Sequence, residues 1–337
     1  MSELPGFLEQ LRRDGWVHDP QARLTPLSGG VSSEIYLVED GGERFVVKRA
    51  LARLRVKDAW FADVGRNASE QDYLACVGGF LPAAVPRLRF GEPAAGYFGM
   101  EYLGEGFANW KQLLLAGVAR TEHAGMAGCI LGEIHRRTLG REDLRRQFDT
   151  TANFHQLRTS PYLLTTGERH PDLQGAFVAE ARRLEATREC LVHGDFSPKN
   201  ILIHGERMVL LDGEVAWYGD PAFDVAFLLN HLFLKGLYHA PHGAVLADMA
   251  EEFWRCYRKT RVEAGGEPET RVARLLPLLL LARVDGKSPV EYLDASRAEF
   301  VRRFVRQQLG RGHLELPALT AAWWKQTSAR AGVPLKP

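Results

Sequence analysis

Short apolar runs separated by glycine turns predict two antiparallel hairpins. In the first hairpin, residues 35–38 and 44–48 flank an Asp-Gly-Gly turn, which is a strong hairpin signal. In the second, residues 201–203 and 208–211 flank a His-Gly-Glu turn. A further strand is expected at residues 97–103, where an apolar run ends in glycines.

Longer segments with apolar residues at helical spacing predict helices. We expect helices at residues 67–77, 121–140 and 173–187. In the second of these, Met126 and Ile134 fall on one face together with the apolar pair between them.

A later segment carries both a helix-start pattern and candidate substrate residues. Ser288, with Pro289 after it and Glu291 three positions on, predicts a capping box at the start of a helix. Arg283 and Asp285 would then precede a helix N-terminus, a place suited to anions or sugar hydroxyls. We therefore take these two residues as candidates for substrate contact.

Composition narrows the class of partner. The chain has 337 residues, of which 45% are hydrophobic and 25% charged, as in ordinary globular proteins. Because 43 basic residues face 42 acidic ones, the net charge of +1 gives no global field for nucleic acid or a membrane surface. The partner expected from this balance is a small molecule.

Cysteine spacing and hydropathy indicate the compartment. The four cysteines lie far apart without a C-x-x-C pair, which favours reduced thiols over disulfides or a zinc site. The N-terminal residues lack the uninterrupted apolar region of a secretory signal. The longest apolar stretch, Leu275 to Ala282, contains Pro277 and is too short to cross a bilayer. We expect a cytoplasmic protein.

Acidic and amide residues gather around the second hairpin. His193-Gly194-Asp195 is followed five positions later by Asn200, and the second strand of the hairpin leads into Asp212. The hairpin should therefore bring Asp195, Asn200 and Asp212 to one end of a small sheet. Phosphoryl transfer needs a carboxylate to orient a hydroxyl and hard oxygen ligands to hold Mg²⁺. Asp195 suits the first task, and the other two suit the second.

These motifs resemble the aminoglycoside and choline kinase-like phosphotransferases, which are distant relatives of protein kinases. H-G-D-x-x-P-x-N stands where protein kinases carry H-R-D-x-x-x-x-N. The second motif departs from the protein-kinase D-F-G and reads D-G-E, similar to the D-x-E form of methylthioribose kinases. The resemblance implies that Glu214 is an additional acid on the metal side. It also implies that Asp224 is a buried carboxylate that accepts backbone hydrogen bonds from the catalytic loop.

The same resemblance implies an α+β, bilobal, protein-kinase-like fold that uses ATP and Mg²⁺. Residues 1–103 would form a small β-rich nucleotide-binding lobe, and residues 104–337 a larger, mainly helical catalytic and substrate-binding lobe. In the first lobe, Lys48 would hold the α- and β-phosphates and pair with Glu70, which we favour over Asp72 because only one of the two can point inward. The remaining nucleotide contacts would be the phosphate-binding turn and the adenine-binding backbone, formed by Ser28, Gly29, Gly30, Ser32, Glu101 and Leu103.

Other residues near these motifs are interpreted as structural. Asp220 before Pro221 is read as a helix cap. His193 is expected to order the loop by hydrogen bonding, and His135 to pack or cap. Lys199 is left open between phosphate contact and solvent exposure.

The acceptor is the part that the motifs do not identify. Aminoglycosides and choline are cationic, whereas residues 141–190 are not rich in acids and the C-terminal tail is basic. The D-G-E resemblance favours a sugar or sugar derivative. An aminoglycoside or choline/amino-alcohol kinase, and a catalytically silent binding protein with the same fold, remain alternatives.

Overall fold

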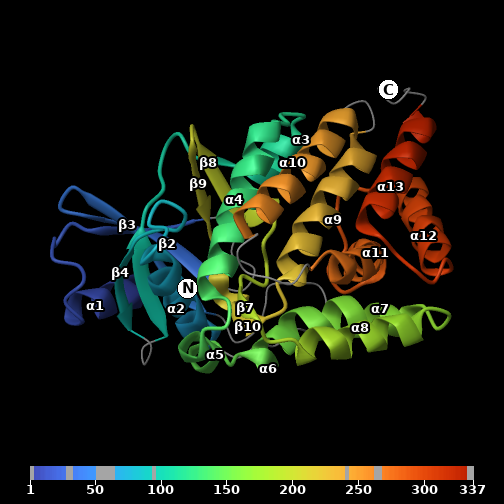
Figure 1. The fold of residues 1–337 in the computed structure, drawn as a ribbon. Helices are drawn as coiled ribbons and strands as arrows, with labels where there is room; N and C mark the ends of the chain where they lie inside the picture. The colour runs from blue at the N-terminus through green and yellow to red at the C-terminus, as the bar shows by residue number, and fades with distance from the viewer. Residues whose placement is uncertain are drawn as a thin grey trace. The chain divides into compact units, whose positions relative to one another are not determined.

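The computed structural model describes residues 4–27, 33–50, 65–92, 96–239, 243–261 and 268–331. Contacts divide the chain into two compact units, Met1–Phe107 and Ala108–Pro337. The elements of both units are labelled along the chain in Figure 1.

The N-terminal unit is built on a five-stranded antiparallel sheet with the strand order β1-β2-β3-β5-β4. The central strands β3 and β5 are buried at consecutive positions, so both faces of the sheet are covered there, whereas the edge strand β1 is mostly exposed. Gly41 and Gly42 have positive φ angles and close the predicted hairpin between β2 and β3. The elements are α1 (Leu4–Arg13), β1 (Arg23–Pro26), β2 (Ser33–Asp40), β3 (Glu43–Ala50), α2 (Arg66–Gly78), β4 (Leu88–Glu92) and β5 (Tyr97–Glu101).

Aromatic and aliphatic side chains from α1 and the sheet form the core of this unit. Phe7 packs edge-on against Tyr97 with ring centroids 5.5 Å apart, and Trp16 stacks on Phe90 at 4.1 Å. Leu11 of α1 is fully buried in the same cluster. The helix α1 therefore covers one face of the sheet.

The C-terminal unit is mainly helical and contains two small sheets. In one sheet β6 pairs with β8 and β8 with β9, and in the other β10 pairs with β7. The hairpin β8–β9 is the one predicted from the sequence. The strands are β6 (Ala108–Asn109), β7 (Cys190–Val192), β8 (Ile201–His204), β9 (Arg207–Leu210) and β10 (Trp217–Gly219). The helices are α3 (Trp110–Leu115), α4 (Thr121–Thr138), α5 (Glu142–Gln147), α6 (Thr151–Phe154), a π-helix (His155–Leu164), α7 (Thr165–Arg169), α8 (Gln174–Ala186), α9 (Ala222–Tyr238), α10 (Gly243–Arg261), α11 (Glu269–Asp285), α12 (Ala295–Leu309) and α13 (Leu316–Ala331), with short 3₁₀ turns at Pro198–Asn200 and Gly213–Val215.

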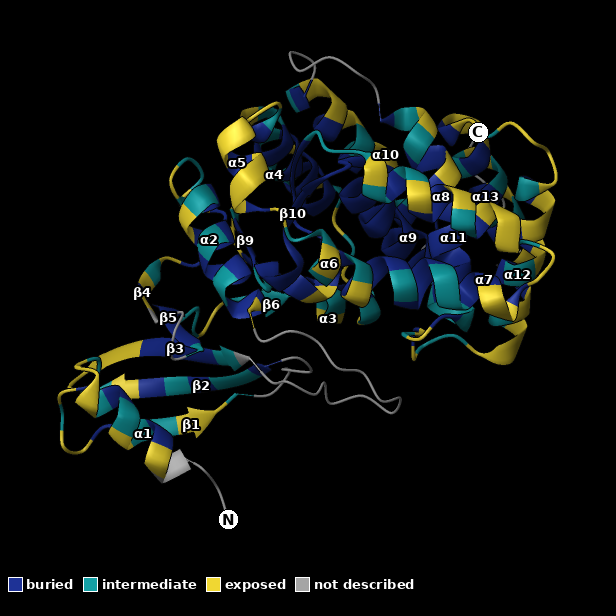
Figure 2. Cartoon of the chain, turned by 90° about the horizontal axis from the view of Figure 1, so that it is seen from below, coloured by how far each residue is buried: buried dark blue, intermediate teal, exposed yellow. Residues whose placement is uncertain are grey.

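Helix α9 forms the centre of this unit. It is buried on all sides, in agreement with its near-continuous apolar sequence, and Figure 2 shows it dark blue among helices whose outer faces are exposed. Helix α4 packs closely on α10 because glycines face the contact. A Cβ atom at Gly128 would lie 2.3 Å from the carbonyl oxygen of Phe253, so a side chain there would force the helices apart.

The predicted capping box at Ser288 is wrong. The segment from Gly286 to Asp294 is not helical, and α12 begins at Ala295 with Asp294 as its N-cap. Ser288 Oγ instead accepts a hydrogen bond from the Arg283 guanidinium at 2.8 Å, so a competing tertiary contact occupies the capping group.

Arg283 and Asp285 therefore do not precede a helix N-terminus. Both lie at the C-terminal end of α11. Within the described ranges, no helix is both long enough and apolar enough to span a membrane.

Candidate active site

The loop between β7 and β8 is held by a carboxylate from α9. The Asp224 side chain accepts hydrogen bonds from the backbone N–H groups of His193 at 2.7 Å and Gly194 at 2.9 Å. Gly194 has a φ of +76°, and a Cβ atom there would lie 2.4 Å from the carbonyl oxygen of Val215, so glycine is required. The role predicted for Asp224 is confirmed.

Two histidines support this arrangement, as expected from the sequence. His193 Nε2 lies 3.1 Å from the carbonyl oxygen of Leu211, and its Nδ1 accepts the backbone N–H of Asp195 at 3.2 Å. His135 is fully buried between Asp224, at 3.3 Å, and the Tyr257 hydroxyl, at 3.0 Å. Burial lowers the pKa of His135, so the ring is neutral and acts as a structural group.

Asp195 lies on this loop between two cations. Its Oδ2 atom is 2.9 Å from the Arg158 guanidinium and 2.9 Å from Lys199 Nζ. Burial alone would raise the pKa of Asp195, but the charges of Arg158 and Lys199 hold it below its usual value. Asp195 is therefore a carboxylate at neutral pH, able to accept a hydrogen bond from a hydroxyl group. Lys199, left open from the sequence, is an ion-pair partner of this group.

Arg158 is the residue that the sequence analysis missed. It is buried with 7% of its surface exposed, and its Nε donates to the Gly194 carbonyl at 2.5 Å while the guanidinium pairs with Asp195. The residue lies in the π-helix that runs through Pro161. Wide π turns recur at functional sites, because an extra residue per turn redirects the side chains. This stretch is rich in Thr, Ser and Pro, so its sequence did not predict a helix. Its proline was the one sequence signal of irregular helix geometry.

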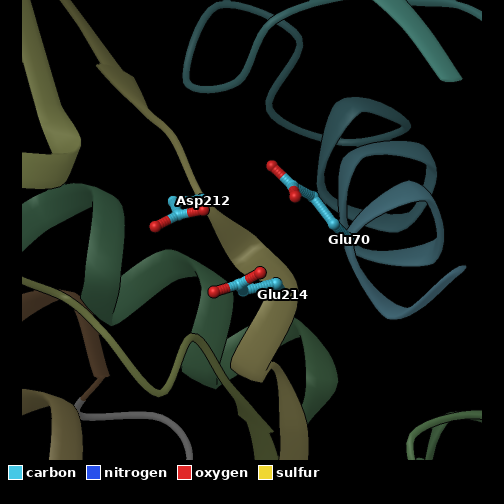
Figure 3. A group of neighbouring side chains, drawn as sticks. All are labelled: Glu70, Asp212 and Glu214. Atoms are coloured by element: carbon cyan, nitrogen blue, oxygen red, sulfur yellow. The ribbon is translucent and has the colours of Figure 1, made fainter. Parts of the chain in front are cut away.

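Two acids follow β9. Asp212 has a left-handed backbone (φ 67°, ψ 49°) and Glu214 lies on the 3₁₀ turn after it, so that their carboxylate oxygens lie within 4.8 Å of each other (Figure 3). Asn200 donates through Nδ2 to the Asp195 carbonyl oxygen at 3.1 Å, which leaves its amide oxygen as an acceptor. These are the hard oxygen donors that Mg²⁺ prefers, so the residues fit the ion that the sequence implied.

The N-terminal unit contains the predicted lysine–glutamate pair. Lys48 Nζ on β3 lies 2.6 Å from the carboxylate of Glu70 on α2, and both side chains are almost fully buried. Asp72 is only partly buried, so Glu70 is the inward residue of the two. Glu101 ends β5, and its N–H donates to the Arg87 carbonyl at 2.9 Å. Leu103 follows in the irregular segment after β5, whereas Ser28, Gly29, Gly30 and Ser32 lie outside the described residues.

The two candidate substrate residues have protein partners. Asp285 is bonded to His170 at 2.8 Å and to Arg302 at 2.7 Å, which hold its pKa low against the effect of burial. Arg283 donates to the Tyr162 hydroxyl at 3.3 Å as well as to Ser288. Arg283 therefore faces the π-helix that carries Arg158. Asp220 caps α9 through the N–H of Ala222 at 2.9 Å, as predicted.

Comparison with known proteins gives one family match and several relatives. A model of the "Phosphotransferase enzyme family" matches residues 23–249. The chain is similar to the methylthioribose kinase of Erwinia tasmaniensis, with 22% identity over 68% of this chain and 64% of that protein. The matched part thus spans less than two thirds of that relative.

Solved structures share the fold at low identity. A choline kinase from Cryptosporidium parvum aligns over 94% of this chain and 99% of its own, with 13% identity and a TM-score of 0.55. An amicoumacin kinase in complex with AMP-PNP and Ca²⁺ aligns over 98% of this chain and 95% of its own, with 13% identity and a TM-score of 0.54. These likenesses confirm the predicted α+β, protein-kinase-like fold.

Proposed function

The chain belongs to the phosphotransferase enzyme family, and from this we propose that it is an ATP- and Mg²⁺-dependent kinase that phosphorylates a hydroxyl group of a small molecule. The observation that carries the proposal is the geometry around Asp195. A buried carboxylate, kept ionised by Arg158 and Lys199, lies on a loop whose backbone is fixed by Asp224. A kinase needs such a group where the acceptor hydroxyl binds.

In this proposal Asp195 orients the acceptor hydroxyl and receives its proton. Because its pKa is lowered, Asp195 is a weak base whose main effect is to align the oxygen for in-line attack. Arg158 and Lys199 hold the carboxylate in place and lie where negative charge develops during transfer. Both are positively charged before the substrate arrives, so little reorganisation is required.

Asn200, Asp212 and Glu214 are proposed as the residues that hold Mg²⁺. Bound Mg²⁺ and ATP would supply the phosphoryl group and offset its charge. The proposed nucleotide contacts in the N-terminal unit are Lys48, kept in position by Glu70, and the backbone from Glu101 to Leu103. The amicoumacin kinase, whose structure holds AMP-PNP and Ca²⁺, supports a nucleotide and a divalent cation as partners of this fold.

For the acceptor we propose a sugar or sugar derivative. The D-G-E motif and the similarity to a methylthioribose kinase both support this class over choline and aminoglycosides. A silent binding protein would not need Asp195, Asn200, Asp212 and Lys48 together. The expected cytoplasmic location stays a prediction.

The test is an assay of ADP release with a panel of sugars, sugar derivatives, amino alcohols and aminoglycosides. Wild-type protein should turn over at least one acceptor, and Asp195→Asn should lower kcat by more than about 100-fold, because the aligned acceptor group is lost. The affinity of Asp195→Asn for ATP·Mg²⁺, measured by calorimetry, should stay within a few-fold of the wild-type affinity. Near-normal turnover by Asp195→Asn would refute the assignment.

A further inference from the structure

Three residues form a stripe on one face of α9. Phe227, His231 and Lys235 are spaced four residues apart, so they follow one another along the helix. At the N-terminal end of the stripe, Phe227 packs on Tyr162 with centroids 5.6 Å apart and lies 5.8 Å from the Arg158 guanidinium. The stripe therefore starts beside the partner of Asp195 and extends about 12 Å along the helix axis.

Lys235, at the far end of the stripe, is a buried cation. Its side chain is 1% exposed, and in the described part of the chain its recorded contact is the Tyr292 ring, 5.2 Å from Nζ, with no ion pair to a carboxylate. The nearby Lys111 is already paired with Glu291 at 2.5 Å. Burial, together with the charges of Lys111 and Arg283, lowers the pKa of Lys235 to about 7. A lysine in this position is costly unless an anion binds to it.

Neighbouring polar atoms also lack partners. His231 Nδ1 and Arg283 Nε are buried and have no hydrogen-bond partner among the described residues. The exposed fraction of His231 is only 7%. Burial and the charges of Lys235 and Arg283 lower the pKa of His231 well below its usual value, so the ring is a neutral hydrogen-bonding group. Buried polar groups without partners are uncommon in folded proteins and call for an explanation.

These residues lie close to the catalytic loop. Tyr162 connects the two places, since the guanidinium groups of Arg158 and Arg283 each lie 5.7 Å from its ring. We call Lys111, Lys235 and Arg283, together with the neutral His231 of the helix stripe, the cationic cluster. Its rim is open to solvent at Lys111 and at Glu291, whose side chains are 31% and 62% exposed.

We propose that the cationic cluster binds an anionic group of the acceptor, a carboxylate or a phosphate. The acceptor is then a negatively charged alcohol, with its hydroxyl at Asp195 and its anion at the cationic cluster. The inference rests on the proposed kinase function and narrows its substrate class. Cationic acceptors such as aminoglycosides and choline would be repelled by Lys235 and Arg283.

The experiment compares probes that differ mainly in charge. Binding of gluconate, ribose 5-phosphate, sorbitol and ribose is measured by calorimetry, and each is then offered as an acceptor in the ADP-release assay. We expect one of the two anions to bind at least 10-fold more tightly than its neutral counterpart. Whether gluconate or ribose 5-phosphate binds more tightly shows whether the group is a carboxylate or a phosphate.

Variants assign the effect to the cluster. Lys235→Met, which keeps the length of the side chain and suits a buried site, should weaken anion binding by at least 10-fold. Lys259→Met, an exposed lysine on α10, should leave it unchanged. Glu291→Gln removes the acid at the rim and should strengthen anion binding. If neither anion binds better than its neutral counterpart, or if Lys235→Met binds as wild type does, the inference is wrong.

The two proposals fail differently. If only neutral or cationic acceptors are phosphorylated, and Asp195→Asn loses this activity, the kinase function stands and the proposal of an anionic acceptor is wrong. Anion binding that depends on Lys235, together with no ADP release for any acceptor of the panel, would keep the anion site and overturn the kinase function instead.

Discussion

Asp224→Asn should both destabilise the C-terminal unit and reduce turnover. The Asp224 carboxylate accepts two backbone N–H groups of the loop, at 2.7 and 2.9 Å, in a fully buried place. An asparagine of the same shape keeps one acceptor oxygen but turns an NH₂ group toward the other N–H. The substitution thus replaces one charge-assisted hydrogen bond by two buried donors that face each other.

The magnitude follows from these two contacts. A hydrogen bond to a charged group contributes about 1.5–3 kcal/mol, and a buried unsatisfied donor costs about 1–3 kcal/mol. We expect a loss of about 3–5 kcal/mol in the free energy of unfolding, a large part of the about 5–15 kcal/mol typical of a domain. For a unit of this size the melting temperature should fall by about 10 °C.

The measurement is urea unfolding monitored by circular dichroism. ADP release is measured at urea concentrations below the unfolding transition. Turnover should fall about 100-fold or more, because Asp195 lies on the displaced loop. Asp143→Asn is the matched control, since Asp143 is exposed and its ion-pair partner among the described residues is Arg141, which is itself exposed. Its unfolding midpoint should equal that of wild type. A wild-type midpoint for Asp224→Asn would show that this carboxylate does not hold the loop.

Two further predictions concern buried cations. Arg158→Met should lower kcat by about 10- to 100-fold with little change in the KM for ATP, because the variant removes one of the two ion-pair partners of Asp195. The measurement is steady-state kinetics, and an unchanged kcat would contradict the prediction. Lys235→Met should stabilise the protein at pH 7 and below, and this gain should shrink toward pH 10. The lowered pKa means that folding disfavours the charged lysine, so wild type loses stability as pH falls from about 10.5 to about 7, by at most about 5 kcal/mol. The groups that face Lys235 are His231 on α9, Lys111 on α3, Arg283 on α11, and Glu291 and Tyr292 before α12. The measurement is the free energy of unfolding of wild type and Lys235→Met at pH 6 and at pH 9.5. The same difference between the two proteins at both pH values would contradict this account.

The loop that carries Asp195 could be predicted because its parts are local. Asp195, Asn200 and Asp212 are separated by one short hairpin, and the spacing alone brings them to one end of it. The role of Asp224 came from the family resemblance, because no local spacing shows that a carboxylate on the next helix accepts hydrogen bonds from this loop. Helix periodicity predicted that Glu70 and Asp72, two positions apart, lie on different faces of α2.

Arg158 could not be predicted from spacing. It reaches Asp195 through tertiary packing of a π-helix, and no local pattern specifies that register. The cationic cluster has the same origin, since Lys111, Lys235 and Arg283 come from three helices. The error at Ser288 had a related cause, because a local capping signal was overridden by the distant guanidinium of Arg283.

The left-handed backbone of Asp212 puts stability and activity in opposition at one position. Among the described residues it is the non-glycine residue with a positive φ, a conformation that costs a side-chain-bearing residue about 1 kcal/mol or more and costs glycine almost nothing. Glycine at this position would relieve the strain and delete a proposed metal ligand in the same step. A library selected for heat resistance alone would therefore collect glycine at 212 and lose turnover, whereas selection for turnover would keep the strained aspartate.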